Sequence, residues 1–328
     1  MKVFNFGSMN IDHVYSMDKF VAPGETLPSN SYSRFAGGKG LNQSIALARA
    51  GMPVSHLGSI GADGVFLKEL LDTNNVDTSY INTLDSATGH AIIQVDSNGE
   101  NCIILHGGAN LENNENEICK LLEVAEKNDV FLTQNETNGV GNLLNKASDL
   151  GLTTVFNPAP MTTDVLSYPL DKVDYLILNY SEAKMLSDKT NVDEIINQLG
   201  RKYPLSTVVL TLGASGVVYK NASMHLHVDA IKTDVVDSTA AGDTFIAYFI
   251  SGICKELSVE DALKFACKAS SICITRHNRS SCWRAARRTS IKSIHSEAIS
   301  CHLIQIRRFK NRMTVVACLS PAHIICHY

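Results

Sequence analysis

The sequence predicts an α/β fold built on a largely parallel sheet, and two observations support this prediction. From about Ile118 onward, apolar runs of strand length alternate with stretches of helical length. Such alternation is typical of βαβ units, whose strands pair in parallel. Residues 88–108 instead alternate with period two around a turn at Asn98-Gly99, which is a hairpin signal. Together with the loop-rich segment 12–36, this hairpin predicts a small accessory sheet over one end of the main sheet.

The first part of the chain supplies a strand, a helix and a second strand. Val3–Gly7 is an apolar run that ends in glycine, as a buried strand followed by a loop would. The stretch 38–51 begins with glycines and repeats apolar residues at helical spacing, with Gly51 as a candidate helix terminus. Val54–Ile60 reads as the next strand, and a helix is predicted to continue through Leu71.

The second part of the chain supplies the alternating units. Strands are predicted at Val130–Thr133, Thr153–Asn157, Tyr175–Leu178, Thr207–Thr211 and Gly216–Tyr219. Helices are predicted at Gly139–Leu150, Ser181–Leu186, Val192–Tyr203, in the stretch that follows Asp243, and at Val259–Ile274. Helices of this length between strands favour crossover connections and therefore a parallel sheet.

Composition excludes several classes of protein. The 328 residues are 45% hydrophobic and 19% charged, with a net charge of −4, which is an ordinary globular composition. The charge gives no reason to expect a nucleic acid or an anionic membrane as partner. Residues 1–12 lack the apolar core of a signal peptide, and the longest apolar runs fall short of the roughly 20 residues that span a bilayer. We therefore expect a cytoplasmic protein, with the nucleus as the alternative compartment.

The strongest chemical motif is the run from Asp237 to Asp243, DSTAAGD, which leads into an apolar helix. Small residues at 240–242 allow a ligand to approach the backbone closely, and the first amides of a helix favour an anion. A carboxylate placed there suits a general base beside a phosphate, which predicts that role for Asp243. The alternative is that Asp243 or Thr239 only caps the helix.

Two further motifs lie near the start of the chain. AGGKGLN at 36–42 fails the spacing of a phosphate-binding P-loop, because Lys39 is followed by Gly40. It could still bring amides, a cation and the Asn42 side chain onto a polyhydroxy ligand, or it could be a plain glycine-rich turn. Asn10 and Asp12 follow the first strand and point the same way in an extended segment, which suits vicinal hydroxyls, although turn-forming residues are the alternative.

Two motifs follow later strands. Asn179 and Glu182 could hold a magnesium ion through water, or could form a capping box at a helix start. The turn TLGASG at 211–216 joins two predicted strands and could be a hairpin turn or a nucleotide contact. The histidines and nine cysteines show no spacing that is typical of a metal site.

In order and spacing, these motifs together resemble the ribokinase-like, phosphofructokinase-B-type carbohydrate kinase family over about residues 2–276. The matching stretches are GSMNID, AGGKGLNQSIALARAG, TGHAIIQVDSNGENCIILHGGAN, QNET, NPAP, NYSE, TLGASG and DSTAAGDTF. The resemblance implies a three-layer α/β/α sandwich with a mainly parallel sheet and a small β-lid from about 12–36 and 88–108. It also implies ATP-dependent phosphorylation of D-ribose to D-ribose 5-phosphate.

The resemblance carries roles to particular residues. Asp243 would deprotonate the primary hydroxyl of the sugar. The sugar would be bound by Asn10, Asp12, Gly38, Lys39, Gly40, Asn42 and Glu136. The nucleotide would meet Asn179, Thr211, Gly213, Gly216, Ala240, Ala241 and Gly242, where the amides of 240–243 form an anion hole. Glu182 would hold Mg²⁺ through water, and Asp237 and Thr239 would bind K⁺ as an activator. The family also implies a homodimer formed through the lid.

The resemblance stops at about Arg276, and residues 277–328 differ in composition from the rest of the chain. They contain nine Lys or Arg residues against one acid, Glu297, and they lack Gly and Asp altogether. We interpret them as an atypical basic, Cys- and His-rich tail produced by a shifted reading frame or an altered splice, with a genuine extension as the alternative. Two functional alternatives follow: a kinase of another sugar or nucleoside, and a sugar-binding relative whose catalysis is impaired because part of the nucleotide and cation sites is altered.

Overall fold

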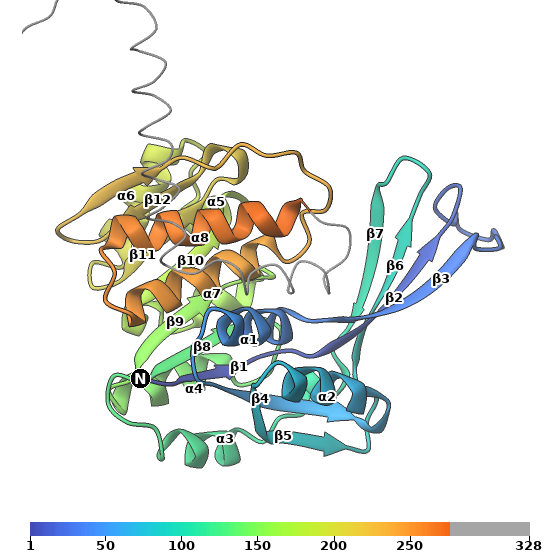
Figure 1. The fold of residues 1–328 in the computed structure, drawn as a ribbon, viewed down its shortest axis with the longest axis horizontal. Helices are drawn as coiled ribbons and strands as arrows, with labels where there is room; N and C mark the ends of the chain where they lie inside the picture. The colour runs from blue at the N-terminus through green and yellow to red at the C-terminus, as the bar shows by residue number, and fades with distance from the viewer. Residues whose placement is uncertain (276–328) are drawn as a thin grey trace, which may run out of the picture. The chain divides into compact units, whose positions relative to one another are not determined.

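The fold is described by a computed structural model, and the structure describes residues 1–275 (Figure 1). Most of the main sheet is parallel. Its nine strands run in the order β13-β12-β11-β10-β9-β8-β1-β4-β5, with only β12 and β13 antiparallel to their neighbours. The strands are β1 (Val3–Phe6), β4 (Val54–Gly61), β5 (Asp77–Leu84), β8 (Val130–Gln134), β9 (Thr153–Asn157), β10 (Tyr175–Asn179), β11 (Thr207–Thr211), β12 (Val217–Lys220) and β13 (His225–Val228). The predicted parallel sheet is confirmed.

Helices cover both faces of this sheet, so the predicted three layers are confirmed. On one face, α1 packs against α7 and α2, and α7 packs against α8. These helices are α1 (Lys39–Arg49), α2 (Val65–Thr73), α7 (Ala241–Cys254) and α8 (Val259–Ile274). The other face carries α3 (Glu115–Leu122), α4 (Val140–Asp149), α5 (Tyr180–Ser187) and α6 (Val192–Lys202). The side chains of β1 point alternately to the two faces of the sheet. Phe4 and Phe6 pack into the core beneath α3, α4, α5 and α6, while Asn5 contacts α1.

A second sheet of four strands, order β3-β2-β6-β7, forms the predicted lid (Figure 1). Its strands are β2 (Asn10–Ser16), β3 (Ser31–Gly37), β6 (Gly89–Val95) and β7 (Asn101–His106). The hairpin turn at Asn98-Gly99 is where the sequence places it, and Gly99 takes the positive φ of 82° that this turn needs. The lid begins directly after β1, so β2 carries residues 10–12 away from the carboxyl end of that strand.

Two regions differ from the prediction or lie beyond it. β5 and α3 were not predicted as elements; β5 is the edge strand of the sheet and mixes buried and exposed positions irregularly. The predicted domain boundary at 276 and the basic tail 277–328 lie outside the described residues. None of the described helices combines the length and apolarity that crossing a bilayer requires.

Candidate active site

The strand order places a candidate site where the chain reverses its direction of travel across the sheet. The chain moves from β1 to β4 on one side and later returns to place β8 on the other side of β1. In open α/β sheets, ligands bind outside the carboxyl ends of the strands at such a switch point. The segments that follow β1 and β8 contain Ser8 and Glu136, and the Ser8 hydroxyl donates a hydrogen bond to the Glu136 carboxylate. The two strand ends therefore meet at one polar cluster.

Asp243 lies in the first turn of α7 and is almost fully buried. Each of its carboxylate oxygens accepts a hydrogen bond from α1: Asn42 Nδ2 donates to Oδ2 at 3.0 Å, and Gln43 Nε2 donates to Oδ1 at 2.9 Å. The alternative that Asp243 or Thr239 caps the helix is wrong, since the N-cap is Ala240, in the left-handed conformation, and no side chain caps the helix. The carboxylate is thus held from two sides at a helix amino end.

The residues predicted to bind sugar gather beside the lid. Asn10 and Asp12 are both 4% exposed and follow one another on the same face of β2. The backbone N–H of Lys39 donates to Glu136 Oε2 at 3.1 Å, which ties the start of α1 to the end of β8. Burial raises the pKa of Glu136, while the charge of Lys39 opposes that rise. Neutral hydroxyls can satisfy such a buried cluster of carboxylates and amides without adding charge.

The glycines of AGGKG permit this close packing at two points. Gly38 has a φ of +94°, and a Cβ there would lie 2.7 Å from the carbonyl oxygen of Ser8. A Cβ on Gly40 would collide with the backbone of Gly7. The start of α1 therefore rests directly on the loop after β1, which explains why this sequence is rich in glycine without being a P-loop.

A polar cavity of about 160 Å³ opens at the same end of the sheet and is lined by Lys39, Asn179, Glu182, Thr211, Ala240, Gly242 and Asp243, among others. Asn179 and Glu182 form the capping box that was one of the two interpretations of this pair: the Asn179 N–H donates to Glu182 Oε2 at 2.9 Å. Burial raises the pKa of Glu182, and the nearby charge of Asp243 raises it further. Asn179 and Glu182 therefore line the same cavity as Asp243.

A larger cavity of about 440 Å³ adjoins the polar one, because both are lined by Thr211 and Gly242. Its other predicted residues are Gly213, Gly216 and Ala241, and apolar side chains such as Phe245 and Ile274 complete it. β11 and β12 pair antiparallel across this turn, where Gly216 has a φ of +91°, so the interpretation of TLGASG as a hairpin turn is confirmed. A flat aromatic ligand with a polar, charged extension would fit the pair of cavities.

The remaining predicted metal residues sit on the loop before α7. The Thr239 N–H donates to Asp237 Oδ1 at 2.8 Å, and the Asp237 N–H donates to the carbonyl oxygen of Ile274 at 3.2 Å. Within residues 1–275, no three His, Cys, Asp or Glu side chains are grouped so that they could hold a metal ion. A monovalent cation at Asp237 and Thr239 therefore stays a prediction.

Sequence reasoning missed Asn110, which fixes the predicted sugar residues. It lies on the 3₁₀ turn Gly108–Leu111 and is 1% exposed. Its Nδ2 donates to Asn10 Oδ1 at 2.7 Å, and its Oδ1 accepts from the backbone N–H of Met9 at 3.0 Å. The available signal was the stretch GGAN directly after the lid hairpin, where a buried amide follows two glycines.

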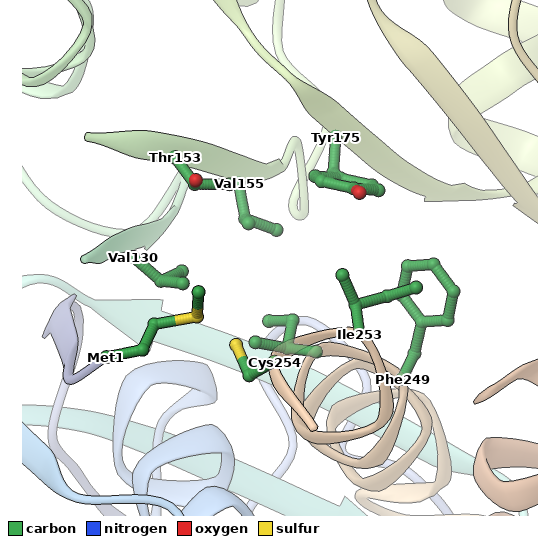
Figure 2. Close-up of a pocket in the computed structure, with 9 residues that line it drawn as sticks. Met1, Val130, Thr153, Val155, Tyr175, Phe249, Ile253 and Cys254 are labelled. Carbon is green, nitrogen blue, oxygen red and sulfur yellow. The ribbon is translucent and has the colours of Figure 1, made fainter. Parts of the chain in front are cut away.

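An apolar hollow at the opposite end of the sheet can be set aside as the site (Figure 2). It is lined at the amino ends of β8, β9 and β10 by Val130, Thr153 and Tyr175, and by Phe249 and Cys254 from the end of α7. Burial raises the pKa of Cys254 to about 11 and that of Tyr175 to about 12. Both side chains are therefore neutral near pH 7, and the hollow, which Met1 also lines, lies at the amino ends of the strands and not at the carboxyl ends where Asp243 is found.

Comparison with known proteins agrees with this geometry. The model of the pfkB family of carbohydrate kinases matches residues 1–286. A ribokinase of Staphylococcus aureus (strain COL) is 34% identical over 290 residues, covering 84% of this chain and 94% of that protein. A ribokinase structure from Cryptococcus neoformans var. grubii serotype A, in complex with ADP, has a TM-score of 0.74 at 32% identity and covers 87% of this chain and 98% of its own. A ribokinase structure from Arabidopsis thaliana, complexed with ribose and ATP, has a TM-score of 0.76 at 26% identity and covers 88% of this chain and 99% of its own.

Proposed function

Since the chain belongs to the pfkB family of carbohydrate kinases, we propose that it transfers the γ-phosphoryl group of ATP to the primary hydroxyl of D-ribose, giving D-ribose 5-phosphate. The observation that carries the proposal is the position of Asp243. Its buried carboxylate lies at the amino end of α7, in the polar cavity and beside the larger one. A base and an anion-binding helix end are then adjacent, as phosphoryl transfer to an alcohol requires.

The sugar occupies the cluster next to the lid. Asp12 and Glu136 accept hydrogen bonds from its hydroxyls, Asn10 and Asn42 accept or donate, and Lys39 and the backbone at Gly38 and Gly40 complete the cluster. Asp243 takes the proton of the primary hydroxyl as that oxygen attacks phosphorus. The lid keeps water from the cleft, which favours transfer to the sugar over hydrolysis of ATP.

The nucleotide occupies the larger cavity, against Thr211, Gly213 and Gly216. Its triphosphate points to the start of α7, where the amides of residues 240–243 neutralise the charge that develops on the transferred group. The first N–H groups of a helix have no carbonyl partner within the helix, so Gly242 and Asp243 suit this task. Asn179 lies beside the triphosphate.

Two cations accompany the reaction in this proposal. Mg²⁺ arrives with ATP, and Glu182 holds it through water, which suits an ion that keeps most of its waters and takes few carboxylates. Oxygen donors at Asp237 and Thr239 suit K⁺ as an activator. Replacing K⁺ by Na⁺ at constant ionic strength should lower turnover, and equal turnover in both salts would remove K⁺ from the proposal.

The lid also supports a homodimer. Every residue of β7 is exposed, including Ile103, Ile104 and Leu105 at 49–59%. An edge strand that shows several large apolar side chains to water is a liability unless a partner covers it. A mass measured by light scattering at twice 35.7 kDa, and its reduction to that mass by Leu105→Glu, would support the dimer. A monomeric wild-type protein would contradict it.

The test of the function is a substrate panel with the full chain. ATP·Mg²⁺ and D-ribose should give ADP and a sugar phosphate that mass spectrometry and NMR identify as the 5-phosphate. Fructose and adenosine, offered under the same conditions, separate this activity from that of a kinase of another sugar or nucleoside. Preference for either over ribose would overturn the proposed substrate. The compartment that we propose is the cytoplasm, which cell fractionation tests.

A further inference from the structure

A chain of buried hydrogen bonds runs from Asp243 into the interior, through residues to which the proposed function gives no role. Gln43, which donates to Asp243 Oδ1, accepts at its own Oε1 from Gln134 Nε2 at 2.7 Å. The same Nε2 of Gln134 donates to Asn5 Oδ1 at 3.0 Å. Gln43 and Asn5 are 0% exposed, and Gln134 is 1% exposed. Three side-chain amides from α1, β8 and β1 therefore stand in series behind the reacting carboxylate.

This series of hydrogen bonds ends at His56 and at the backbone carbonyls of Gly40 and Gly7. Asn5 Nδ2 donates to the Gly40 carbonyl at 2.8 Å and to Ser44 Oγ at 2.7 Å. The Ser44 hydroxyl, which accepts from Asn5, donates its proton to His56 Nδ1 at 2.8 Å. His56 Nε2–H donates in turn to the Gly7 carbonyl at 3.2 Å. This pattern requires neutral His56, and burial lowers the pKa of His56 to about 4.

The two backbone carbonyls decide which way each amide faces. A carbonyl only accepts, so Asn5 must turn its NH₂ group to Gly40 and its oxygen to Gln134. Gln134 must then present its NH₂ group to Asn5 and to Gln43 Oε1, which leaves the NH₂ group of Gln43 facing Asp243. A reversed amide at any of these positions would set two donors or two acceptors against one another in a buried site.

Gly7 and Gln134 show that the arrangement is costly to build. Gln134 Oε1 is buried without a hydrogen-bond partner, and a Cβ on Gly7 would collide with that same atom. A buried acceptor left unsatisfied lowers stability, so the packing of the core alone would favour an apolar side chain at this position. An amide at position 134 is explained if the protein needs it to fix the orientation of the Gln43 side chain.

We propose that Gln43 is a positioning residue for the carboxylate of Asp243, and that Gln134 and Asn5 keep its amide in the donating orientation. Asn42 holds one carboxylate oxygen and Gln43 the other, so the carboxylate cannot rotate and presents one fixed edge to the sugar hydroxyl. A donor to the charged form also favours the ionised carboxylate that a base needs. This inference rests on the proposed function, because it takes Asp243 as the base.

Gln43→Met is the direct test, since it removes the donor and keeps a side chain of similar length. We expect kcat for ribose phosphorylation to fall about 10–100-fold, the scale of a small misplacement of a reacting group. The KM values for ribose and ATP should stay within about threefold, because Gln43 touches neither ligand in the proposed complex. The acid limb of the pH–rate profile should move to higher pH, because the carboxylate has lost a donor that favours its charged form.

Gln134→Met provides a second, indirect test. It leaves Gln43 in place but frees its amide to turn, so we expect a smaller loss of kcat and a shift of the acid limb in the same direction. The matched control is Thr154→Val at the far end of β9. Thr154 is 0% exposed, and its Oγ1 contacts the Lys172 carbonyl at 3.0 Å, Asp174 Oδ2 at 2.9 Å and the Asp174 N–H at 2.9 Å. The variant loses these hydrogen bonds, and none of them involves Gln43, Gln134 or Asn5. Its pH–rate profile should match that of the wild type.

The outcomes separate this inference from the proposed function. Loss of ribose phosphorylation in Asp243→Asn, in a protein whose wild type phosphorylates ribose, supports the function independently of Gln43. If Gln43→Met then keeps kcat within twofold and its acid limb unmoved, Gln43 does not position the base although the function stands. If Gln43→Met does not fold, Gln134→Met decides, and an unmoved acid limb there rejects the inference. A wild type that phosphorylates no sugar overturns the function, and the inference with it.

Discussion

Replacing Asp243 by asparagine is the sharpest perturbation of the site, because the structure predicts two separate effects. Both oxygens of Asp243 accept from side-chain amides, Asn42 at 3.0 Å and Gln43 at 2.9 Å. An asparagine there has one oxygen and one NH₂ group. With the amides of Asn42 and Gln43 as they stand, its NH₂ group meets the NH₂ group of one of them, and only a reversal of Asn42, whose Oδ1 is buried without a hydrogen-bond partner, would relieve this. The change is therefore not the neutral replacement that its shape suggests.

The two effects have different sizes and different assays. Loss of the base should lower turnover by about 10²–10⁴-fold, which a coupled assay of ADP release measures. The buried pair of opposed donors should lower the free energy of unfolding by at most about 1–3 kcal/mol, and by less where Asn42 reverses its amide, which chemical denaturation measures. Turnover above about a tenth of the wild-type value would show that Asp243 is not the base.

A double variant separates the two effects. In Asp243→Asn combined with Gln43→Glu, residue 43 becomes an acceptor for both the new NH₂ group and Gln134 Nε2, at the cost of the long 3.5 Å bond to Asn157. The total charge of the site is unchanged, but the carboxylate now belongs to residue 43 instead of residue 243. We expect stability to recover towards the wild type while turnover stays low. Turnover that recovered with stability would refute a specific role for a carboxylate at 243.

Three other predictions concern different parts of the molecule. Asp12→Ala should weaken ribose affinity about 5–150-fold in calorimetry, since unpaired hydroxyls in a closed site cost about 1–3 kcal/mol, and should spare ATP affinity; unchanged ribose affinity would remove Asp12 from the site. His56 has a pKa of about 4 in the fold against 6.5 in the unfolded chain, so the unfolded state takes up the proton first as the pH falls. The free energy of unfolding should drop by up to about 3 kcal/mol between pH 6.5 and 4, and His56→Asn should flatten that slope; an equal slope in both proteins would contradict this. At pH 8, in the Leu105→Glu variant in which no partner subunit covers β7, a thiol reagent should modify exposed Cys102 far faster than Cys254, whose pKa burial raises to about 11, and peptide mapping that finds equal rates would be inconsistent with that burial.

Local patterns were enough to predict most of the elements and the position of Asp243. Glycines mark the start of α1, and the apolar run after Asp243 marks α7, so each signal lies within a few residues of what it predicts. β5 was missed because it is an edge strand whose exposed and buried positions do not alternate. The capping alternative for Asp243 failed because Ala240 adopts a positive φ of 61°, which a non-glycine residue does not signal in sequence.

The residues behind the site could not be predicted in this way. Gln43 meets Gln134, which lies 91 positions away, and Asp243, which lies 200 positions away. Each of these polar residues, taken alone, fits a helix surface or a strand end. Only the pairing of β1 with both β4 and β8, with α1 lying across them, turns His56 and the amides into one connected chain.

The charges of the site also explain why a divalent cation has to accompany the nucleotide in the proposed reaction. Glu136 and Glu182 both have raised pKa values, chiefly through burial, and the charge of Asp243 adds to each rise. Lys39 opposes both rises, so one ammonium group is the shared counter-charge of these two buried carboxylates. A triphosphate that binds beside Glu182 and Asp243 would add negative charge to carboxyl groups for which Lys39 is the one counter-charge named above. In the proposed reaction, Mg²⁺ would supply that charge on the phosphates themselves, which would leave Lys39 to the sugar side of the site.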